Sequence, residues 1–332
     1  MSKNATVRLS DVASVAGVSL STASKALNGS TRISAETRRR VKEAADRLDF
    51  RPNALALSFV SGRSRTIGLL THRAANTFTR PVVIGAVLAL GEQQQAVLML
   101  DGDVGAHRAM GESIRQLRDR RIDGVLVIGD GHEHISPSLT HHFDVPVAYA
   151  FTASDSAEDV VYLPDNLGAG RLAAQHLLDT GRRRIAHITA EPGSLAVQLR
   201  EKGFREVLSA AGLEPAGPVR YGAWSREWGA SAMAALLESD ERPDAVFCGN
   251  DHIALGALDV CTARGIGVPG DLALIGVDNW EGVVVDQDVR RVTTIDLELM
   301  TLGREAAASL LGPAGEPGEH TVPATLVLGP ST

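Results

Sequence analysis

The stretch from Leu9 to Asn28, LSDVASVAGVSLSTASKALN, constrains the fold more than any other part of this chain. Ser10 is a residue type that commonly caps a helix, and Asp11 would place a negative charge in the first turn, where it suits the helix dipole. The apolar residues that follow recur at positions i, i+1 and i+4, the spacing of one buried helix face. They are Val12, Ala13 and Ala16, so we expect a short helix capped by Ser10.

A second short helix should follow Gly17, a residue that can turn the chain through positive φ without steric cost. Ser19 would cap this helix, and Asn28 with Gly29 would close it. Two short helices joined by a glycine turn predict a helix-turn-helix, the motif whose second helix lies in the major groove of DNA. Small residues at a helix crossing also occur in plain bundle packing, so this pattern alone leaves that alternative open.

A third helix is expected from Ala35 to Leu48, with Ser34 as its cap. Its apolar residues fall on one stripe and its cations on the opposite face, as in a helix that packs one side against a core. The inner stripe is Val41, Ala44, Ala45 and Leu48, and the outer face is Arg38, Arg39, Arg40 and Lys42. The chain therefore begins with a small all-α domain.

The charge of the chain is strongly asymmetric. Residues 1–65 contain 12 Lys and Arg against 5 Asp and Glu, a net charge of +7, and since the whole chain carries −7 the remainder carries −14. A basic head on an acidic body is typical of a protein that binds a polyanion, because contacts to phosphates release counterions and supply most of the non-specific affinity. A solvated charged helix face is the alternative, and the helix-turn-helix spacing makes it the weaker one.

From Thr66 onward, short apolar runs alternate with helical stretches. The runs are continuous rather than alternating, which indicates parallel strands covered on both faces. We expect strands at Ile67–Leu70, Val97–Leu100, Val125–Ile128, Val145–Tyr149, Val160–Leu163, Ile185–Ile188, Val246–Cys248, Leu272–Val277 and Ala324–Leu328. This alternation predicts a doubly wound α/β fold with two lobes, and a ligand site at the carboxyl ends of the strands in the cleft between them.

The remaining composition excludes several classes of protein. Two cysteines, Cys248 and Cys261, make neither a disulfide framework nor a zinc site, and both suit core positions. The N-terminus shows no apolar signal segment, and no apolar run is long enough to span a membrane. We therefore expect a cytoplasmic protein that needs no metal and no cofactor.

Patterns that would indicate an enzyme are weak. Residues 168–173 spell G-x-G-x-x-A, but they follow Pro164-Asp165-Asn166 rather than a strand, and no acidic strand end follows at the distance that a dinucleotide site needs. No G-x-S-x-G segment is present. The histidines of the segment 132–134 and of the pair 141–142 lack the surroundings of a metal site, and we interpret them as solvated.

The chain closely resembles the LacI/GalR family of bacterial transcriptional repressors along nearly its whole length. The matching segments are LSDVA from Leu9, AGVS from Ala16, SAETRRRV from Ser34, FRPNALA from Phe50 and SGRSRTIGLL from Ser61. The resemblance implies a helix-turn-helix DNA-binding domain at 1–50, a hinge helix and linker at 51–65, and a two-lobed, periplasmic-binding-protein-like effector-binding and dimerisation domain at 66–332. It places lobe 1 at about 66–163 and 293–319, and lobe 2 at about 164–292 and 320–332.

The resemblance also assigns residues of the second helix to DNA. Leu20, Ser21 and Lys25 match the family's base-contacting positions. A lysine can donate to guanine O6 and N7, and a leucine can contact a thymine methyl group. Four residues with hydroxyl or amide side chains suit phosphate contacts that fix the register on DNA: Ser19, Thr22, Ser24 and Asn28.

The hinge departs from the family in an informative way. The family usually has P-N-A-x-A-R-S-L, whose leucine wedges into the minor groove. Asn53, Ala54 and Leu55 fit this pattern, whereas Leu57 stands at the arginine position and Phe59 at the leucine position. Phenylalanine is another residue that wedges between base steps. Either these apolar residues belong to the core or, as we hypothesise, the segment folds into a helix only in the operator-bound dimer.

Five residues match the ligand cleft of the family: Phe78, Arg200, Trp224, Asn250 and Asp278. The fork of an arginine suits vicinal hydroxyls or a carboxylate, and polar groups around an aromatic face suit a sugar. We expect Asp251 to cap the helix that follows it. Asp165 and Asn166 are expected either to cap a helix or to line the cleft, and Trp280 to belong to a lid or to the core.

The sequence therefore predicts a homodimeric transcriptional regulator that binds near-palindromic operator DNA, and it favours a repressor. Its effector is expected to be a sugar or a sugar derivative, and neither enzymatic activity nor a membrane partner is expected. A free-standing sugar-binding protein of the periplasmic type is the alternative, but the lack of a signal segment and the basic head disfavour it.

Overall fold

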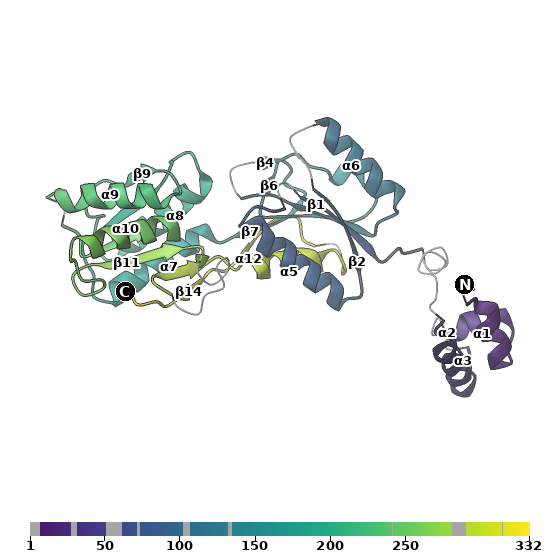
Figure 1. Cartoon of the computed structure of the whole chain (residues 1–332). Coiled ribbons are helices and arrows are strands. Elements are labelled where there is room, and N and C mark those ends of the chain that lie inside the picture. The colour runs from purple at the N-terminus through teal and green to yellow at the C-terminus, as the bar shows by residue number, and fades with distance from the viewer. Residues whose placement is uncertain are drawn as a thin grey trace, which may run out of the picture. The chain divides into compact units, whose positions relative to one another are not determined.

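The computed structural model describes residues 7–27, 32–50, 62–71, 74–101, 107–131, 135–240, 242–280, 290–313 and 315–332. The chain divides into two compact units, Met1–Ser64 and Arg65–Thr332, which we call the N-terminal and C-terminal units (Figure 1). No helix of the described ranges is both long and apolar enough to cross a membrane.

The N-terminal unit packs three helices around one small core: α1 (Leu9–Ala16), α2 (Leu20–Leu27) and α3 (Ala35–Arg47). Their buried residues are those of the predicted apolar stripes, namely Val12, Ala13, Ala16, Ala23, Ala26, Val41, Ala44 and Ala45. Gly17 adopts φ 63° between α1 and α2, as the predicted turn requires. The predicted caps also form, since Ser19 Oγ accepts the Thr22 N–H at 3.1 Å and Ser34 Oγ accepts the Thr37 N–H at 3.2 Å.

The predicted cap of the first helix is wrong. The helix begins at Leu9 and its N-cap residue is Arg8, so Ser10 lies inside the first turn. The Asp11 carboxylate accepts the Arg8 backbone N–H at 2.8 Å. Asp11 is the third residue of the helix, and its side chain satisfies the backbone N–H of the N-cap residue Arg8, as in a capping box.

The first lobe of the C-terminal unit contains a six-stranded parallel sheet in the order β13-β7-β5-β3-β1-β2. Its strands are β1 (Thr66–Thr71), β2 (Ala96–Asp101), β3 (Gly124–Ile128), β5 (Val147–Ala150), β7 (Val160–Pro164) and β13 (Gly318–Val322). Helices α5 (Thr79–Glu92) and α12 (Leu299–Ser309) cover one face, and α6 (His107–Asp119) covers the other (Figure 1). The short strands β4 (Ile135–Ser136) and β6 (Ala153–Ser154) pair beside this sheet.

The second lobe repeats this architecture in the order β14-β12-β11-β10-β8-β9, and only β14 is antiparallel to its neighbour. Its strands are β8 (Ile185–Ala190), β9 (Arg220–Gly222), β10 (Ala245–Cys248), β11 (Ala273–Val277), β12 (Thr293–Asp296) and β14 (Thr325–Val327). Helices α7 (Asn166–Asp179) and α8 (Leu195–Ala210) cover one face, and α9 (Arg226–Glu238) and α10 (Asp251–Ala263) the other. The predicted fold class is confirmed, and each apolar run predicted as a strand forms one.

The chain crosses between the lobes three times, and the crossings differ from the expected lobe boundaries. The segment from Thr293 to Asp296 was expected in lobe 1, but it pairs with β11 and belongs to the second sheet. The strand ending at Val322 pairs with β7, so the return to lobe 2 comes later than residue 320. The strand Thr293–Asp296 does not appear as an apolar run in the sequence, because it contains Thr293 and Thr294. Both threonines are buried, and their backbone or hydroxyl groups are hydrogen-bonded within lobe 2.

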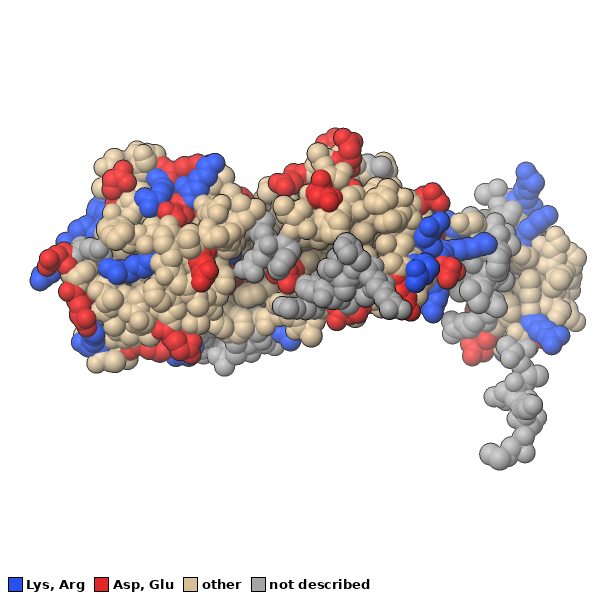
Figure 2. Space-filling model, turned by 90° about the horizontal axis from the view of Figure 1, so that it is seen from above, with Lys and Arg blue, Asp and Glu red and all other residues tan. Residues whose placement is uncertain are grey.

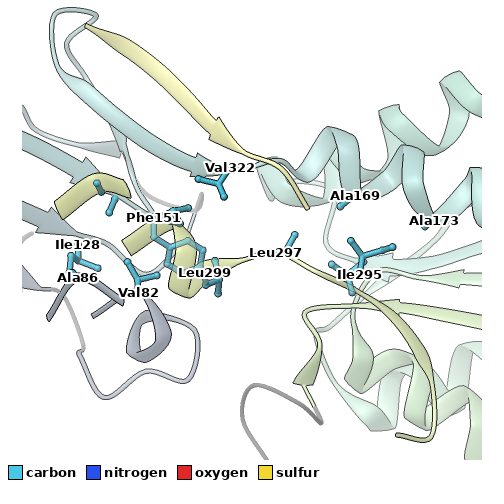
Figure 3. Close-up of a cluster of buried hydrophobic side chains, with 14 of the residues drawn as sticks. Val82, Ala86, Ile128, Phe151, Ala169, Ala173, Ile295, Leu297, Leu299 and Val322 are labelled. Carbon is cyan, nitrogen blue, oxygen red and sulfur yellow. The ribbon is translucent and has the colours of Figure 1, made fainter. Parts of the chain in front are cut away.

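One cluster of buried apolar side chains runs through both lobes and the crossings between them. Figure 3 shows Leu297 on the crossing segment, between Ile295 of β12 and Leu299 at the start of α12. The apolar contact is therefore continuous from one sheet to the other. On the face drawn in Figure 2, acidic and basic side chains are intermixed over the second lobe.

Two glycines allow α7 and α8 to pack backbone against backbone. A Cβ atom on Gly170 would lie 2.0 Å from the Arg200 carbonyl oxygen, and one on Gly203 would lie 2.1 Å from the Leu167 carbonyl oxygen. The G-x-G-x-x-A pattern that includes Gly170 thus serves helix packing. The crossing also fixes the position of Arg200, which lies on α8 directly opposite α7.

Replacing Gly170 by alanine should therefore destabilise the C-terminal unit by about 1–3 kcal/mol, because the added methyl group must displace backbone. Gly91 is the matched control, since it also lies in a helix but an added Cβ meets nothing within 4 Å. There, alanine should be neutral or stabilise by up to about 1 kcal/mol through helix propensity. Urea denaturation of both variants measures the difference, and equal stabilities would contradict the close helix crossing.

Candidate functional sites

One side of helix α2 is exposed to solvent, and the opposite side packs into the core of the N-terminal unit. Leu20 is 54 % exposed, and Ser21 and Lys25 are also exposed. Ala23 and Ala26, on the opposite side, are 0 % and 4 % exposed. The three residues predicted to contact bases thus share the free face of a helix whose orientation is fixed by its buried alanines.

Two of the residues predicted to contact phosphates, Ser19 and Thr22, lie at the start of the same helix. The hydroxyls of Ser19 and Thr22 lie 2.8 Å apart, and Ser24 is half-buried one turn further on. Backbone N–H groups at a helix start attract anions, so this end of α2 suits a phosphate oxygen. Asn28 and the hinge residues Asn53, Ala54, Leu55 and Phe59 lie outside the described residues, as does the predicted hinge helix.

The C-terminal unit contains a cavity of about 420 Å³ between its two lobes. All five residues predicted for the ligand cleft line it: Phe78, Arg200, Trp224, Asn250 and Asp278. Phe78 comes from the first lobe, where it precedes α5, and the other four come from the second lobe. The cleft therefore lies at the carboxyl ends of the strands, as expected for a doubly wound fold.

Arg200 is the most constrained residue of the cleft and is 5 % exposed. Its Nε donates to Asn166 Oδ1 at 2.8 Å, and one terminal nitrogen donates to the Gly249 carbonyl oxygen at 2.6 Å. The other terminal nitrogen lies 3.5 Å from Asp278 Oδ1. The guanidinium carbon also lies 5.5 Å from the ring centroid of Trp224, within the range of a cation–π contact.

Asp278 is held in an unusual backbone conformation at the end of β11. Its φ is 101° and that of Asn279 is 50°, both in the region that favours glycine. Burial raises the pKa of the Asp278 carboxyl to about 6, although the neighbouring Arg200 guanidinium acts in the opposite direction. Burial also lowers the pKa of Arg200. Strained backbone and a shifted pKa at one position are typical of a functional site.

The predicted capping role of Asp251 is wrong, because Asn250 takes it in addition to lining the cleft. Asn250, not Asp251, caps α10, since its Oδ1 accepts the Ile253 N–H at 2.9 Å. Asp251 is the first residue of the helix and is 1 % exposed. Its carboxylate instead accepts hydrogen bonds from Thr294 Oγ1 and the Trp280 N–H, both at 2.7 Å. The neutral amide caps because the carboxylate is committed to the neighbouring strands.

Several residues outside the predicted set also line the cleft, among them Trp280, His252 and Asn166. Trp280 reaches Phe78 of the other lobe, with ring centroids 6.0 Å apart, and packs edge-on against His252 at 4.2 Å. Asn166 lines the cleft and positions Arg200, whereas Asp165 caps α7. The sequence position of Trp280, directly after Asp278-Asn279, could have predicted that it lines the cleft, because residues next to the end of a strand lie at the same edge of the sheet.

The expected solvated histidines are only partly described. The rings of His141 and His142 lie with their centroids 3.9 Å apart and their planes tilted by 43°, whereas the segment 132–134 lies outside the described residues. Across the part of the chain that the structure describes, no three His, Cys, Asp or Glu side chains group in a way that could hold a metal ion.

Two family models match the chain. Residues 8–53 match "Bacterial regulatory proteins, lacI family", and residues 174–332 match "Periplasmic binding protein-like domain". The HTH-type transcriptional regulator CelR of Thermobifida fusca is 34 % identical over 326 residues, covering 96 % of this chain and 94 % of that protein. The HTH-type transcriptional repressor PurR of Vibrio parahaemolyticus is 32 % identical over 310 residues, covering 91 % and 90 %.

Solved structures show the same architecture. A complex of the transcriptional regulator CelR with cellobiose is 30 % identical, covers 98 % of this chain and 100 % of that one, and has a TM-score of 0.62. A lac repressor dimer bound to operator and the anti-inducer ONPF is 24 % identical, covers 98 % and 99 %, and has a TM-score of 0.71. At this lower identity, the second likeness concerns the fold alone.

Proposed function

The chain belongs to the lacI family of bacterial regulatory proteins, and on this premise we propose that it represses transcription as a homodimer on a near-palindromic operator, controlled by a sugar bound in its cleft. Members of the family are DNA-binding transcriptional regulators with a ligand-binding domain, and the relatives named above are regulators rather than enzymes. The observation that carries the proposal is the cavity, in which a buried arginine meets aromatic and amide side chains.

The free face of α2 supports sequence-specific reading of the operator. Lys25 can donate to the major-groove edge of guanine, and the exposed Leu20 can contact a thymine methyl group. Ser21 is short enough to let the helix enter the groove. Hydroxyls at the start of the helix, from Ser19 and Thr22, suit the phosphate contacts that fix its register.

Replacing Lys25 by alanine should cost about 1–3 kcal/mol of operator binding and relax the preference at one base pair in each half-site. Fluorescence anisotropy with the operator and its single-base variants measures both effects. Lys202, exposed on α8 of the C-terminal unit, is the matched control and should leave operator affinity unchanged on replacement by alanine. Equal losses on every base variant would instead assign Lys25 to phosphate contact.

The outer face of α5 supports self-association. The helix carries no charged residue between Arg80 and Glu92, and its exposed face presents Ile84, Val87 and Leu88, which are 41, 41 and 49 % exposed. A helix that is apolar all round is normally buried all round, and a contiguous apolar patch on a surface marks an interaction site. We assign this face to a second copy of the chain, because a near-palindromic operator requires two-fold related heads.

Replacing Leu88 by glutamate should raise the dimer dissociation constant by at least about tenfold, equivalent to about 1.4 kcal/mol, because it places two like charges at an apolar interface. Analytical ultracentrifugation over a concentration series measures this constant. The control is glutamate at Leu172, a leucine of α7 that is 36 % exposed outside this face. A dimer unaffected by the Leu88 change would exclude α5 as the interface.

The cleft supports a sugar as effector. Asn166, Ser194 and Asn250 offer amide and hydroxyl groups, while Phe78 and Trp280 offer apolar ring surfaces. Polar groups that fix orientation beside an aromatic surface are the combination that suits a hydroxylated ring. Cellobiose, present in the solved CelR complex, is therefore the first sugar to test.

In the wild type, cellobiose or another member of a panel of common mono- and disaccharides should change operator affinity by about 5–150-fold. Replacing Arg200 by alanine should abolish this response but leave operator affinity without sugar in place, because Arg200 lies in the C-terminal unit. Arg205, one turn further along α8 and exposed, is the matched control for alanine replacement. Loss of operator binding in the Arg200 variant would show a structural role instead.

A further inference from the structure

Phe78 is carried by a segment that is fixed to the first lobe where α5 begins. Its backbone N–H donates to Asn76 Oδ1 at 3.1 Å. The next residue, Thr79, is 0 % exposed, and its hydroxyl donates to the Gly129 carbonyl oxygen at 3.1 Å. Hydrogen bonds within lobe 1 therefore hold the backbone from which the Phe78 ring extends into the cleft.

Trp280 is fixed to the second lobe, just after the end of β11. Its backbone N–H donates to the buried Asp251 carboxylate at 2.7 Å, and the same carboxylate accepts a hydrogen bond from Thr294 Oγ1 of β12. Its ring lies edge-on to His252 of α10, with the ring centroids 4.2 Å apart and the planes at 84°. All of these partners belong to lobe 2.

The two rings meet across the cleft. Their centroids lie 6.0 Å apart and their planes are inclined by 59°, which is within the range in which aromatic side chains attract one another. Phe78 and Trp280 both line the cavity, and both are only half-buried. Because each ring is held by a different lobe, parting of the lobes breaks this contact and leaves the hydrogen bonds of each segment intact.

Resting on the proposed function, we propose that Phe78 and Trp280 form a clasp that holds the two lobes closed around the effector. The attraction in an aromatic pair is weak enough for thermal motion to break it, yet it changes the ratio of open to closed molecules by about two- to tenfold. The effector enters and leaves when the lobes part, so the clasp slows both steps. Of the two roles expected for Trp280, this proposal assigns the lid rather than the core.

The distance between spin labels on the two lobes tests the clasp in the absence of any effector. Asp119→Cys on α6 and Lys202→Cys on α8 place the labels at exposed positions of lobe 1 and lobe 2. The native Cys248 and Cys261 are both 0 % exposed and so do not compete for the label. Mixing with an excess of unlabelled chain leaves one labelled copy in each proposed dimer. Double electron–electron resonance then measures distances within one chain.

Removing either ring should increase the population at longer distance. Phe78→Leu and Trp280→Leu keep apolar volume but lose the ring pair, and each should raise the ratio of open to closed molecules at least about twofold. The double variant should match the single ones, because all three lack the same contact. Trp280→Phe keeps a ring and should retain the wild-type distances. Trp224→Leu is the matched control, since the partner of that ring, Arg200, lies on the same lobe.

Unchanged distances in both single variants would overturn the clasp, and so would effects that add in the double variant or an equal effect of Trp224→Leu. Thermal melting verifies that each variant is folded, and either single variant tests the contact by itself. A wild type whose operator affinity responds to no sugar would contradict the proposed effector control, whereas these distances are measured without a sugar. The two failures are therefore distinguishable.

Discussion

The buried guanidinium of Arg200 is the interaction on which the C-terminal unit is built around its cleft. A charge removed from water is costly unless hydrogen bonds and an opposite charge surround it. Here the partners come from the start of α7, from the end of β10 and from the end of β11. The close crossing of α7 and α8 at Gly170 and Gly203 sets the distance to the first of these partners. The cleft is thus organised before any ligand enters it, which lowers the cost of ordering side chains on binding.

Hydrogen bonds connect the residues at the cleft with the segments that cross between the lobes. Asn279, next to Asp278, donates from Nδ2 to Asp296 at 2.7 Å, and Asp296 accepts the Glu298 N–H at 2.8 Å. Glu298 also accepts from Thr325 at 2.9 Å, on the last crossing. The end of β11 is therefore linked to two of the three crossings, and the third is linked by the Asp165 N–H to the Val322 carbonyl at 3.1 Å.

The sequence predicts those features whose physical cause is local. Caps, the glycine turn and the apolar stripe specify the three helices of the N-terminal unit, and continuous apolar runs specify the inner strands of both sheets. Strands such as Thr293–Asp296 and Gly318–Val322 are less visible, because their polar groups are satisfied by partners far away in the chain. The wrong prediction of Asp251 as the cap of α10 has the same origin, since its carboxylate is bonded to Thr294 and Trp280 and Asn250 caps the helix instead. Resemblance to a family supplied the cleft residues, but not the aromatic contact between Phe78 and Trp280.

The central claim is that an effector-controlled, two-fold symmetric repressor reads DNA through α2. It is tested most directly by selecting bound fragments from sheared genomic DNA at low and at physiological salt, because contacts to phosphates weaken with salt more than the reading of bases does. One near-palindromic sequence, enriched at both salt concentrations and released or tightened by a sugar, is the predicted result. Uniform binding of all fragments that vanishes at physiological salt would contradict the account, since it would leave a basic head without an operator.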